Sequence, residues 1–294
     1  MSEQALESRP SGASAEAISY HYDVGTKFFR LWLDRSLTYS AARWGDPRQV
    51  AVSPVSLELA QEAKLDFHLK AVGVGPGDSL LDVGCGWGSM LRRAVEQYGV
   101  AAATGLTLST DQDNHLRALD LPGVEVRLEN YEDYRPAGKF SGIVSVGAFE
   151  HFTGPGLSAV DKVAIYRRFF ERCHGWLNRG ARLSLQSITW GNVARDRTGF
   201  IIAQDIFPET DPPYVADVLE ASADTFEPIY MENCRSDYVR TLQVWLERLR
   251  ARQREIEAMT RAGTFEFYER YLRRSIYGFK KKQFQLCRFV FERD

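Results

Sequence analysis

The stretch SLLDVGCGWG at residues 79–88 decides the fold. Its first five residues form a short apolar run, as in a buried strand, and glycines then occupy every second position. The next stretch, MLRRAVEQY, places Leu91, Ala94 and Val95 on one face of a helix. Glycines let the backbone turn tightly and approach a ligand closely, and a helix start offers free N–H groups to an anion. The stretch therefore predicts a strand, a ligand-binding turn and a helix.

Apolar runs and helical stretches alternate through the next hundred residues. We expect strands at VAAATGLTL (100–108), VEVRL (124–128), FSGIVSVGAF (140–149) and RLSLQSI (182–188), with helices at STDQDNHLRAL (109–119) and VAIYRRFFERCHGWL (163–177). Such alternation predicts an α/β fold with a doubly wound, mostly parallel sheet.

The pattern changes after Trp190. Two charged helical stretches follow at 236–259 and 264–282, and the strand-like run QFQLCRFVF comes near the end. Helical apolar spacing also precedes the sheet, so we expect an α-helical cap built from both ends of the chain. The predicted organisation is an N-terminal arm at 1–18, a helical cap segment at 19–75, an α/β core at 76–190, a helical cap and substrate region at 191–282, and a closing strand of the core sheet at 283–294.

Composition and charge exclude several classes of protein. The formal net charge of −2 gives no electrostatic drive towards nucleic acid. The four cysteines are scattered, which suits a reducing cytosol, and the histidines lack a metal-binding spacing. No apolar run reaches the ~18 residues of a membrane span, and the first residues lack a signal-peptide pattern. We expect a cytoplasmic enzyme with a small hydrophobic substrate. The sequence leaves its oligomeric state open, a homo-oligomer included.

The glycine motif favours S-adenosylmethionine (SAM) over a dinucleotide. Its spacing is GxGxG, not the GxGxxG of dinucleotide sites, because Ser89 occupies the last position. The second strand ends in GLTLS at 105–109, which offers no carboxylate to a ribose diol. The alternative interpretation is a tight strand–helix turn without a ligand.

Several separate motifs in order identify a family resemblance. They are HYD (21–23), LTYS (37–40), LLDVGCGWGSM (80–90), GLTLSTDQ (105–112), VGAFEH (146–151), IFP (206–208) and YVRTLQVW (238–245). The chain resembles the cyclopropane fatty acid synthase and mycolic acid synthase family of SAM-dependent methyltransferases. The resemblance covers about residues 21–291 and implies the Rossmann-like fold of class I methyltransferases.

The resemblance also implies a set of cofactor-binding residues. Three should close over the methionine part of SAM, namely Tyr22, Tyr39 and Ser40. The motif residues Asp82, Gly84, Gly86 and Val146 should line the cofactor turn, Leu108 and Gln112 should hold the ribose and adenine, and Tyr131 should flank the adenine. The alternative for each tyrosine is an ordinary core or surface aromatic.

The expected chemistry is methyl transfer to a carbon–carbon double bond. An alkene is a poor nucleophile, so attack on the sulfonium methyl needs alignment and exclusion of water. A carboxylate and aromatic faces suit the carbocation that results. Glu150 follows the fourth strand and is our candidate base, with Phe149 and His151 keeping it dry. Trp190 is expected to present its ring to the cation, and Tyr238 to hydrogen-bond Glu150 or a bound anion. The alternatives are a solvent-facing Glu150 and a Trp190 that packs the cap.

Two departures from the family bear on the base. In cyclopropane-forming relatives a bicarbonate ion is held by a cysteine, the glutamate, a histidine and the tyrosine. The matching positions here are Ala41, Glu150, Gln186 and Tyr238, and Asp237 stands where relatives often carry histidine. We therefore expect Glu150 itself to take the proton and the product to be a methylated alkene.

The substrate prediction rests on weaker patterns. Few residues separate Ile188 from IFP (206–208), which predicts a short lid and a small substrate. The last helical stretch is basic, and we expect Arg273, Arg274, Tyr277 and Lys280, with Phe149 and Gln186, to bind substrate. Basic groups beside an apolar pocket can hold a diphosphate, with Mg²⁺ bound by Asp205, Glu209 or Asp211. This favours a short prenyl diphosphate such as geranyl diphosphate, in isoprenoid secondary metabolism. No metal-ligand set is assigned, and a solvated helix face and loop remain the alternative.

Three other functions remain open. One is a cyclopropane- or methyl-forming synthase that acts on unsaturated acyl lipids. Another is an O- or N-methyltransferase of a polyketide-like metabolite, in which Glu150 would deprotonate a heteroatom. The last is a SAM-binding protein without methyl transfer.

Overall fold

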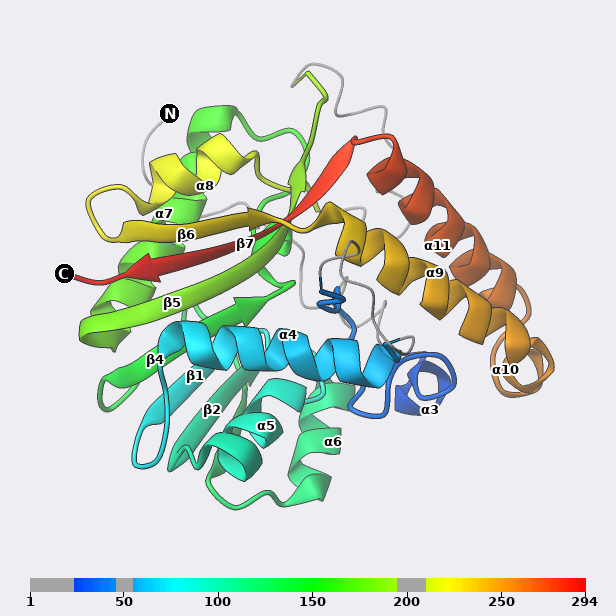
Figure 1. The fold of residues 1–294 in the computed structure, drawn as a ribbon, viewed down its shortest axis with the longest axis horizontal. Coiled ribbons are helices and arrows are strands. Elements are labelled where there is room, and N and C mark those ends of the chain that lie inside the picture. Colours follow the sequence, from blue (N-terminus) through cyan, green and yellow to red (C-terminus); the bar gives the residue numbers. More distant parts are fainter. Residues whose placement is uncertain (1–23, 46–54, 195–209) are drawn as a thin grey trace.

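A seven-stranded sheet forms the centre of the protein (Figure 1). The computed structural model describes residues 24–45, 55–194 and 210–294. The strands lie in the order β3-β2-β1-β4-β5-β7-β6. The first five pair in parallel, while β7 runs antiparallel to both β5 and β6. Their bounds are β1 Ser79–Val83, β2 Ala102–Thr107, β3 Val124–Leu128, β4 Phe140–Val146, β5 Leu177–Trp190, β6 Glu227–Asn233 and β7 Phe284–Glu292.

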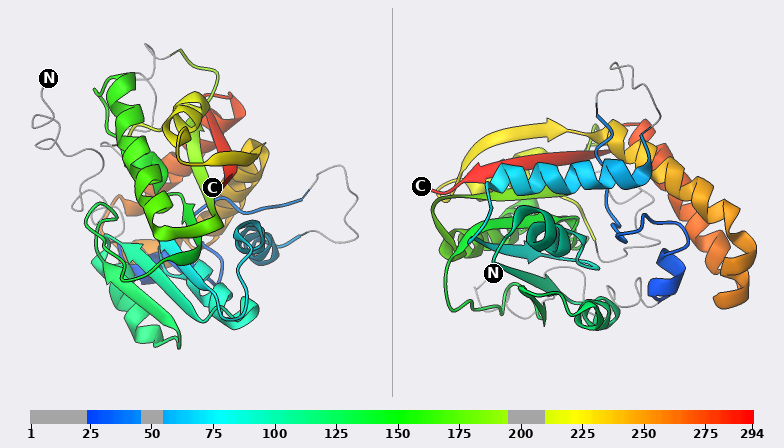
Figure 2. Two further views of the ribbon diagram at one scale, coloured as in Figure 1. Left: turned by 90° about the vertical axis from the view of Figure 1, so that its left-hand side faces the viewer. Right: turned by 60° about the horizontal axis from the view of Figure 1, so that its bottom comes forward.

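Helices cover both faces of this sheet, as an α/β doubly wound fold requires. On one face lie α4 and α5, and on the other lie α7 and α8 (Figures 1 and 2). The helices are α3 Thr26–Phe29, α4 Leu57–Val72, α5 Ser89–Tyr98, α6 Thr110–Leu119, α7 Ala159–Trp176, α8 Val215–Ser222, α9 Arg235–Ala251, α10 Gln253–Met259 and α11 Thr264–Lys280, with a 3₁₀ turn η1 at Phe149–His151. Within the described residues, no helix is both long and apolar enough to cross a membrane.

Local sequence explains where several elements begin. Ser109 caps α6 by accepting a hydrogen bond from the Gln112 backbone N–H at 3.3 Å, as its residue type predicts. In α5, Leu91 and Ala94 are fully buried while Val95 is partly buried, so the predicted apolar face does turn inward. The buried residues of β4 lie next to each other along the strand, because helices cover both sides of it.

The structure differs from the sequence-based expectation at four elements. Strand β5 already begins at Leu177, directly after α7, and the first charged helix is broken at Arg252 into α9 and α10. Neither α8 nor β6 was predicted. In β6 nearly every residue is exposed, and among the described strands it pairs with β7 alone. It therefore lacks the apolar alternation that marks a half-buried strand.

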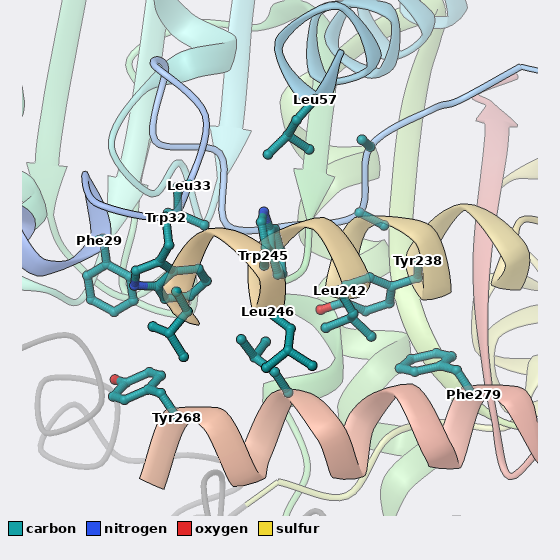
Figure 3. Close-up of a cluster of buried hydrophobic side chains, with 14 of the residues drawn as sticks. Phe29, Trp32, Leu33, Leu57, Tyr238, Leu242, Trp245, Leu246, Tyr268 and Phe279 are labelled. Carbon is teal, nitrogen blue, oxygen red and sulfur yellow. The ribbon is translucent and has the colours of Figure 1, made fainter. Parts of the chain in front are cut away.

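Segments from both ends of the chain pack into one apolar cap. Side chains of residues 28–44 meet those of α9 and α11, and Figure 3 shows Trp32 and Trp245 at the centre of this cluster. The ring centroids of Trp32 and Trp245 lie 5.8 Å apart, and those of Phe28 and Tyr268 lie 4.7 Å apart. Aromatic pairs at such separations stabilise a core beyond their buried area. The cap is therefore held by its own aromatic core beside the carboxyl ends of the parallel strands.

Candidate active site

The turn after β1 and the turn after β4 lie against each other, because β1 and β4 are neighbouring strands. Gly84 follows β1 with a φ of +84°, and a Cβ placed on it would lie 2.4 Å from the Cβ of Ala148. Gly86 has a φ of +55° and open space where a Cβ would stand. The strand order reverses between β1 and β4, and open α/β sheets bind ligands at such a switch point.

A cavity lies over this switch point. It brings together nine of the ten residues that the sequence predicted for the cofactor: Tyr39, Ser40, Asp82, Gly84, Gly86, Leu108, Gln112, Tyr131 and Val146. The tenth, Tyr22, lies outside the described residues. Gln112 accepts a hydrogen bond from the Thr107 hydroxyl at 2.7 Å, which fixes its amide in the cavity wall. Tyr131 lines the cavity and packs its ring against those of Phe152 and Phe169.

The polar groups of this cavity fit SAM. Asp82 Oδ1 is buried and has no hydrogen-bond partner among the described residues, although buried polar atoms are normally paired. Burial raises the pKa of Asp82 to about 7. A cationic ligand group would supply the missing partner, and the amino group of SAM is such a group. The open space at Gly86 lets a ligand contact the backbone. In the described part of the chain, no cluster of three or more His, Cys, Asp or Glu side chains could hold a metal ion.

A second, mostly apolar pocket adjoins the first. Both are lined by Tyr39, Ser40, Gly147 and His151. Most of the remaining wall comes from β5, β7, α9 and α11, including Ile188, Phe279, Phe284 and Leu286. A reactive group held in one cavity can therefore meet a substrate held in the other.

Glu150 lies at the junction of the two cavities. A Cβ placed on Gly147 would lie 3.9 Å from Glu150 Oε1 and 3.8 Å from the Ser40 side chain. The Glu150 side chain is 4% exposed, and its Oε2 accepts a hydrogen bond from Ser187 at 3.0 Å. Burial raises its pKa to about 7, with no cation among the causes. It is the only carboxylate among the described residues that line the apolar pocket. A carboxylate with such a pKa can accept a proton at neutral pH.

The four positions that the family resemblance led us to compare with a bicarbonate site also come together here. Ala41, Glu150, Gln186 and Tyr238 all line the apolar pocket. Ala41 has no hydrogen-bonding group, and the Oε1 of Gln186 accepts a bond at 2.8 Å from Arg288. Without the cysteine and the imidazole, these residues do not fit the ion.

His151 and Tyr238 also line the apolar pocket. His151 Nδ1 lies 2.8 Å from Thr210 Oγ1, and burial lowers the pKa of the imidazole to about 4. His151 is therefore neutral near pH 7. Tyr238 packs its ring on Phe279, with centroids 4.8 Å apart (Figure 3).

Two aromatic residues that we expected in the reaction centre line neither cavity. Trp190 stacks on Phe284 with centroids 4.9 Å apart, and its indole N–H donates to Asp211 Oδ1 at 2.7 Å. Phe149 is fully buried and stacks on Tyr166 at 4.4 Å. Both rings pack against other buried aromatic side chains behind the pocket wall and therefore do not face either cavity.

The basic helix α11 contributes one of its predicted substrate residues to the pocket. Both Arg273 and Arg274 are exposed, but only Arg274 lines the pocket wall, while Arg273 pairs with Glu269 at 3.7 Å. Tyr277 and Lys280 are exposed and line neither cavity.

The acidic residues proposed for Mg²⁺ form no ion site in the described structure. Asp211 uses one carboxylate oxygen for Trp190 and the other for an ion pair with Lys162. The other two, Asp205 and Glu209, lie outside the described residues, as does most of the short lid expected between Ile188 and the IFP motif at 206–208.

Sequence reasoning missed several residues that line the cavities. In α11 these are Phe267, Arg270, Tyr271 and Ser275, and the spacing of Arg270 and Arg274 by one helical turn was an available signal. Lys64 of α4 lines the cofactor cavity. It was missed because no local pattern marks a lysine in a helix as buried.

Known proteins are similar to this chain in both fold and sequence. The family model described as mycolic acid cyclopropane synthetase matches residues 10–289. The chain is 36% identical to the cyclopropane mycolic acid synthase MmaA2 of Mycobacterium tuberculosis over 278 residues, which cover 87% of this chain and 90% of the relative. The crystal structure of MmaA2 superposes with a TM-score of 0.83 at 32% identity, covering 96% of this chain and 99% of that one.

Two further solved structures are similar to this chain. The mycolic acid cyclopropane synthase CmaA1, complexed with S-adenosylhomocysteine (SAH) and CTAB, matches with a TM-score of 0.83 at 31% identity over 96% of this chain and 99% of that one. The geranyl diphosphate C-methyltransferase of Streptomyces coelicolor matches with a TM-score of 0.65 at 18% identity, over 97% of this chain and 100% of that one. At that identity it shows a shared fold alone.

Fold, cavity and relatives together define a SAM-dependent methyltransferase of the class I, Rossmann-like type. The chain belongs to the mycolic acid cyclopropane synthetase family.

The turn at Gly84 gives a direct test of the cofactor site. Gly84→Ala should lower SAH affinity by more than about tenfold, because the new methyl group would collide with Ala148 in a backbone conformation that favours glycine. Isothermal titration calorimetry measures the affinity. Gly77→Ala is the matched control, since Gly77 has a similar φ of +87° but open space around it. Equal affinity in both variants would contradict the assignment.

Proposed function

We propose that this methyltransferase transfers the methyl group of SAM to a carbon–carbon double bond of an unsaturated acyl chain, with Glu150 as the base. The observation that carries this is the position of Glu150, the one carboxylate in the described wall of an apolar pocket that adjoins the cofactor cavity. An apolar pocket suits a hydrocarbon chain, and the relatives are named for mycolic acids.

The cofactor, when bound, supplies an electrophilic methyl group on a sulfonium. The shared wall at Tyr39, Ser40 and Gly147 aligns the double bond beside it, and the apolar lining excludes water from the cation that follows. Carbon–carbon bond formation breaks the carbon–sulfur bond and leaves a positive charge on the neighbouring carbon. Glu150 offsets that charge and then accepts a proton from carbon.

The proton goes to Glu150 because the bicarbonate positions do not fit the ion. Ala41 and Gln186 replace the groups that relatives use, and Arg288 already engages the Gln186 oxygen. We propose that the product is a methylated alkene, as the loss of those groups first indicated. Burial lowers the pKa of His151 to about 4 and raises that of Glu150 to about 7, so Glu150 is the stronger base of the two.

A prenyl diphosphate remains the second candidate substrate, favoured by one observation. Arg270 and Arg274 lie one turn apart on α11 and both line the apolar pocket. Two guanidinium groups so placed can bind a diphosphate. In the described residues, however, no cluster of acidic side chains stands ready to hold the Mg²⁺ that would accompany it.

Replacing the base should separate chemistry from binding. In Glu150→Gln we expect methyl transfer to fall by at least about a hundredfold, because general-base catalysis typically contributes that much, while SAH affinity changes little. Single-turnover assays and calorimetry give the two quantities. Glu129→Gln, at the cofactor cavity but outside the apolar pocket, is the matched control. Near-normal turnover in Glu150→Gln would remove Glu150 from the mechanism.

The pH profile should report the same carboxylate. Burial raises the pKa of Glu150 to about 7, so its base form is lost below that pH. We expect kcat/KM to rise with pH through this region and to level off above it. A profile that is flat from pH 5.5 to 8 would show that no group with this pKa controls the reaction.

The substrate class is tested with a matched panel. Purified protein is assayed for SAH formation with oleoyl phospholipid vesicles, an oleoyl thioester, their stearoyl counterparts and geranyl diphosphate with Mg²⁺. We expect methylation of an oleoyl substrate and none of the saturated controls. Methylation of geranyl diphosphate alone would overturn the acyl assignment and favour the second candidate.

A further inference from the structure

Lys64 is a buried cation in the wall of the cofactor cavity. It belongs to α4, but its side chain is only 1% exposed and lines the cavity together with Asp82 and Ser40. Its Nζ donates a hydrogen bond to the Ser40 hydroxyl at 2.9 Å. In the described part of the chain, this is its only hydrogen bond, and no carboxylate lies within ion-pair distance.

This environment is unfavourable for an ammonium group. An ammonium carries three donors, and burying a charge without a counter-ion costs much free energy. Among the charged groups that face Lys64, Asp34 and Asp82 favour the ammonium form and Arg288 opposes it. Asp34 is occupied by the backbone N–H groups of Ser36 and Thr38. Burial outweighs these carboxylates and lowers the pKa of Lys64 to about 7.

Asp82, in the same cavity, is a buried acidic group that lacks a cationic partner. Its Oδ1 is buried without a partner, and Lys64 is the one charged group that acts on its ionisation. Two groups of opposite charge thus line one cavity, each short of a partner. The amino-acid end of the cofactor is a zwitterion, and it carries the two groups that are missing.

We propose that Lys64 and Asp82 form the receptor for the amino-acid end of the cofactor, with Lys64 holding its carboxylate and Asp82 its ammonium. This deepens the proposed function and rests on its cofactor, but not on its acceptor substrate. Ser40 lines both cavities, so its bond to Lys64 also links this receptor to the junction where the methyl group is transferred.

Binding of the cofactor should change the protonation of both Lys64 and Asp82. Near pH 7 the free protein holds Asp82 partly protonated and Lys64 partly neutral. Binding of the zwitterion favours the charged form of both groups. Asp82 then loses a proton and Lys64 gains one, so the two changes oppose each other in the wild-type protein.

The test compares three ligands by isothermal titration calorimetry. SAH carries both charged groups, S-adenosyl-3-thiopropylamine lacks the carboxylate, and 5′-methylthioadenosine lacks the whole amino-acid end. The variants are Lys64→Met, which keeps the length of the side chain, and Asp82→Asn. Lys70→Met is the matched control, because Lys70 lies on the same helix but is exposed.

The affinities should separate the two residues. Lys64→Met should weaken SAH binding by about 30-fold or more, as loss of one partner from a buried charge pair does, and leave the other two ligands within about threefold of wild type. Asp82→Asn should weaken both SAH and the thiopropylamine. Lys70→Met should leave the affinities for all three ligands unchanged. An equal loss for all three ligands in Lys64→Met, or no loss of SAH affinity, would overturn the proposal.

Two further readouts distinguish the receptor from a structural role. Titrations of SAH in buffers of different ionisation enthalpy should show net proton release in Lys64→Met and net uptake in Asp82→Asn. The ligand-free Lys64→Met protein should melt no lower than wild type, because an unpaired buried charge has been removed. Unchanged proton exchange would contradict the receptor. Since no acceptor substrate is present, failure of the acyl assignment would leave these results unaffected.

Discussion

The close contact between the turns after β1 and β4 is the constraint on which the rest of the site depends. Only a glycine at position 84 allows the cofactor turn to approach Ala148, and Ala148 directly precedes the 3₁₀ turn that carries Glu150. Because β1 and β4 are neighbours at the point where strand order reverses, both turns open at the same edge of the sheet. The cofactor cavity and the base are thus joined by backbone geometry, and the cap closes the pocket from above.

The two cavities differ in the charged groups that line them. The cofactor cavity contains unpaired buried groups of both signs, Lys64 and Asp82, which suits a zwitterion. The apolar pocket holds one carboxylate in its described wall, and that carboxylate has a hydroxyl partner, while neither Arg270 nor Arg274 of the same wall acts on its ionisation. A buried carboxylate without a cation is costly for folding. Retaining it at the junction makes sense if positive charge arises there during the reaction.

Local pattern predicted the sheet and the glycine turn, and the family resemblance predicted the residues that line the cavity over that turn. The glycine stretch at 79–88 and the alternation after it gave the parallel sheet, and the family motifs led to Glu150. The orientation of side chains around that residue was not predictable. Phe149 and Glu150 are adjacent, yet the 3₁₀ turn sends one into the core and the other into the pocket. Trp190 ends β5 at the sheet edge where the site lies. Its ring, however, stacks on Phe284 and its indole N–H bonds to Asp211, which holds the ring outside the pocket. The place of Lys64 in the cofactor cavity was visible only in the structure, where α4 lies beside the turn after β1.

The fate of the transferred methyl hydrogens tests the mechanism most directly. With trideuteriomethyl-labelled SAM and a monounsaturated acyl substrate, the mass of the product counts the deuterium atoms that remain. If Glu150 takes a proton from a chain carbon, the product keeps all three deuterium atoms and one double bond. A saturated product with only two deuterium atoms would show that the proton leaves the new methyl group to close a ring, and would contradict the account given for the base.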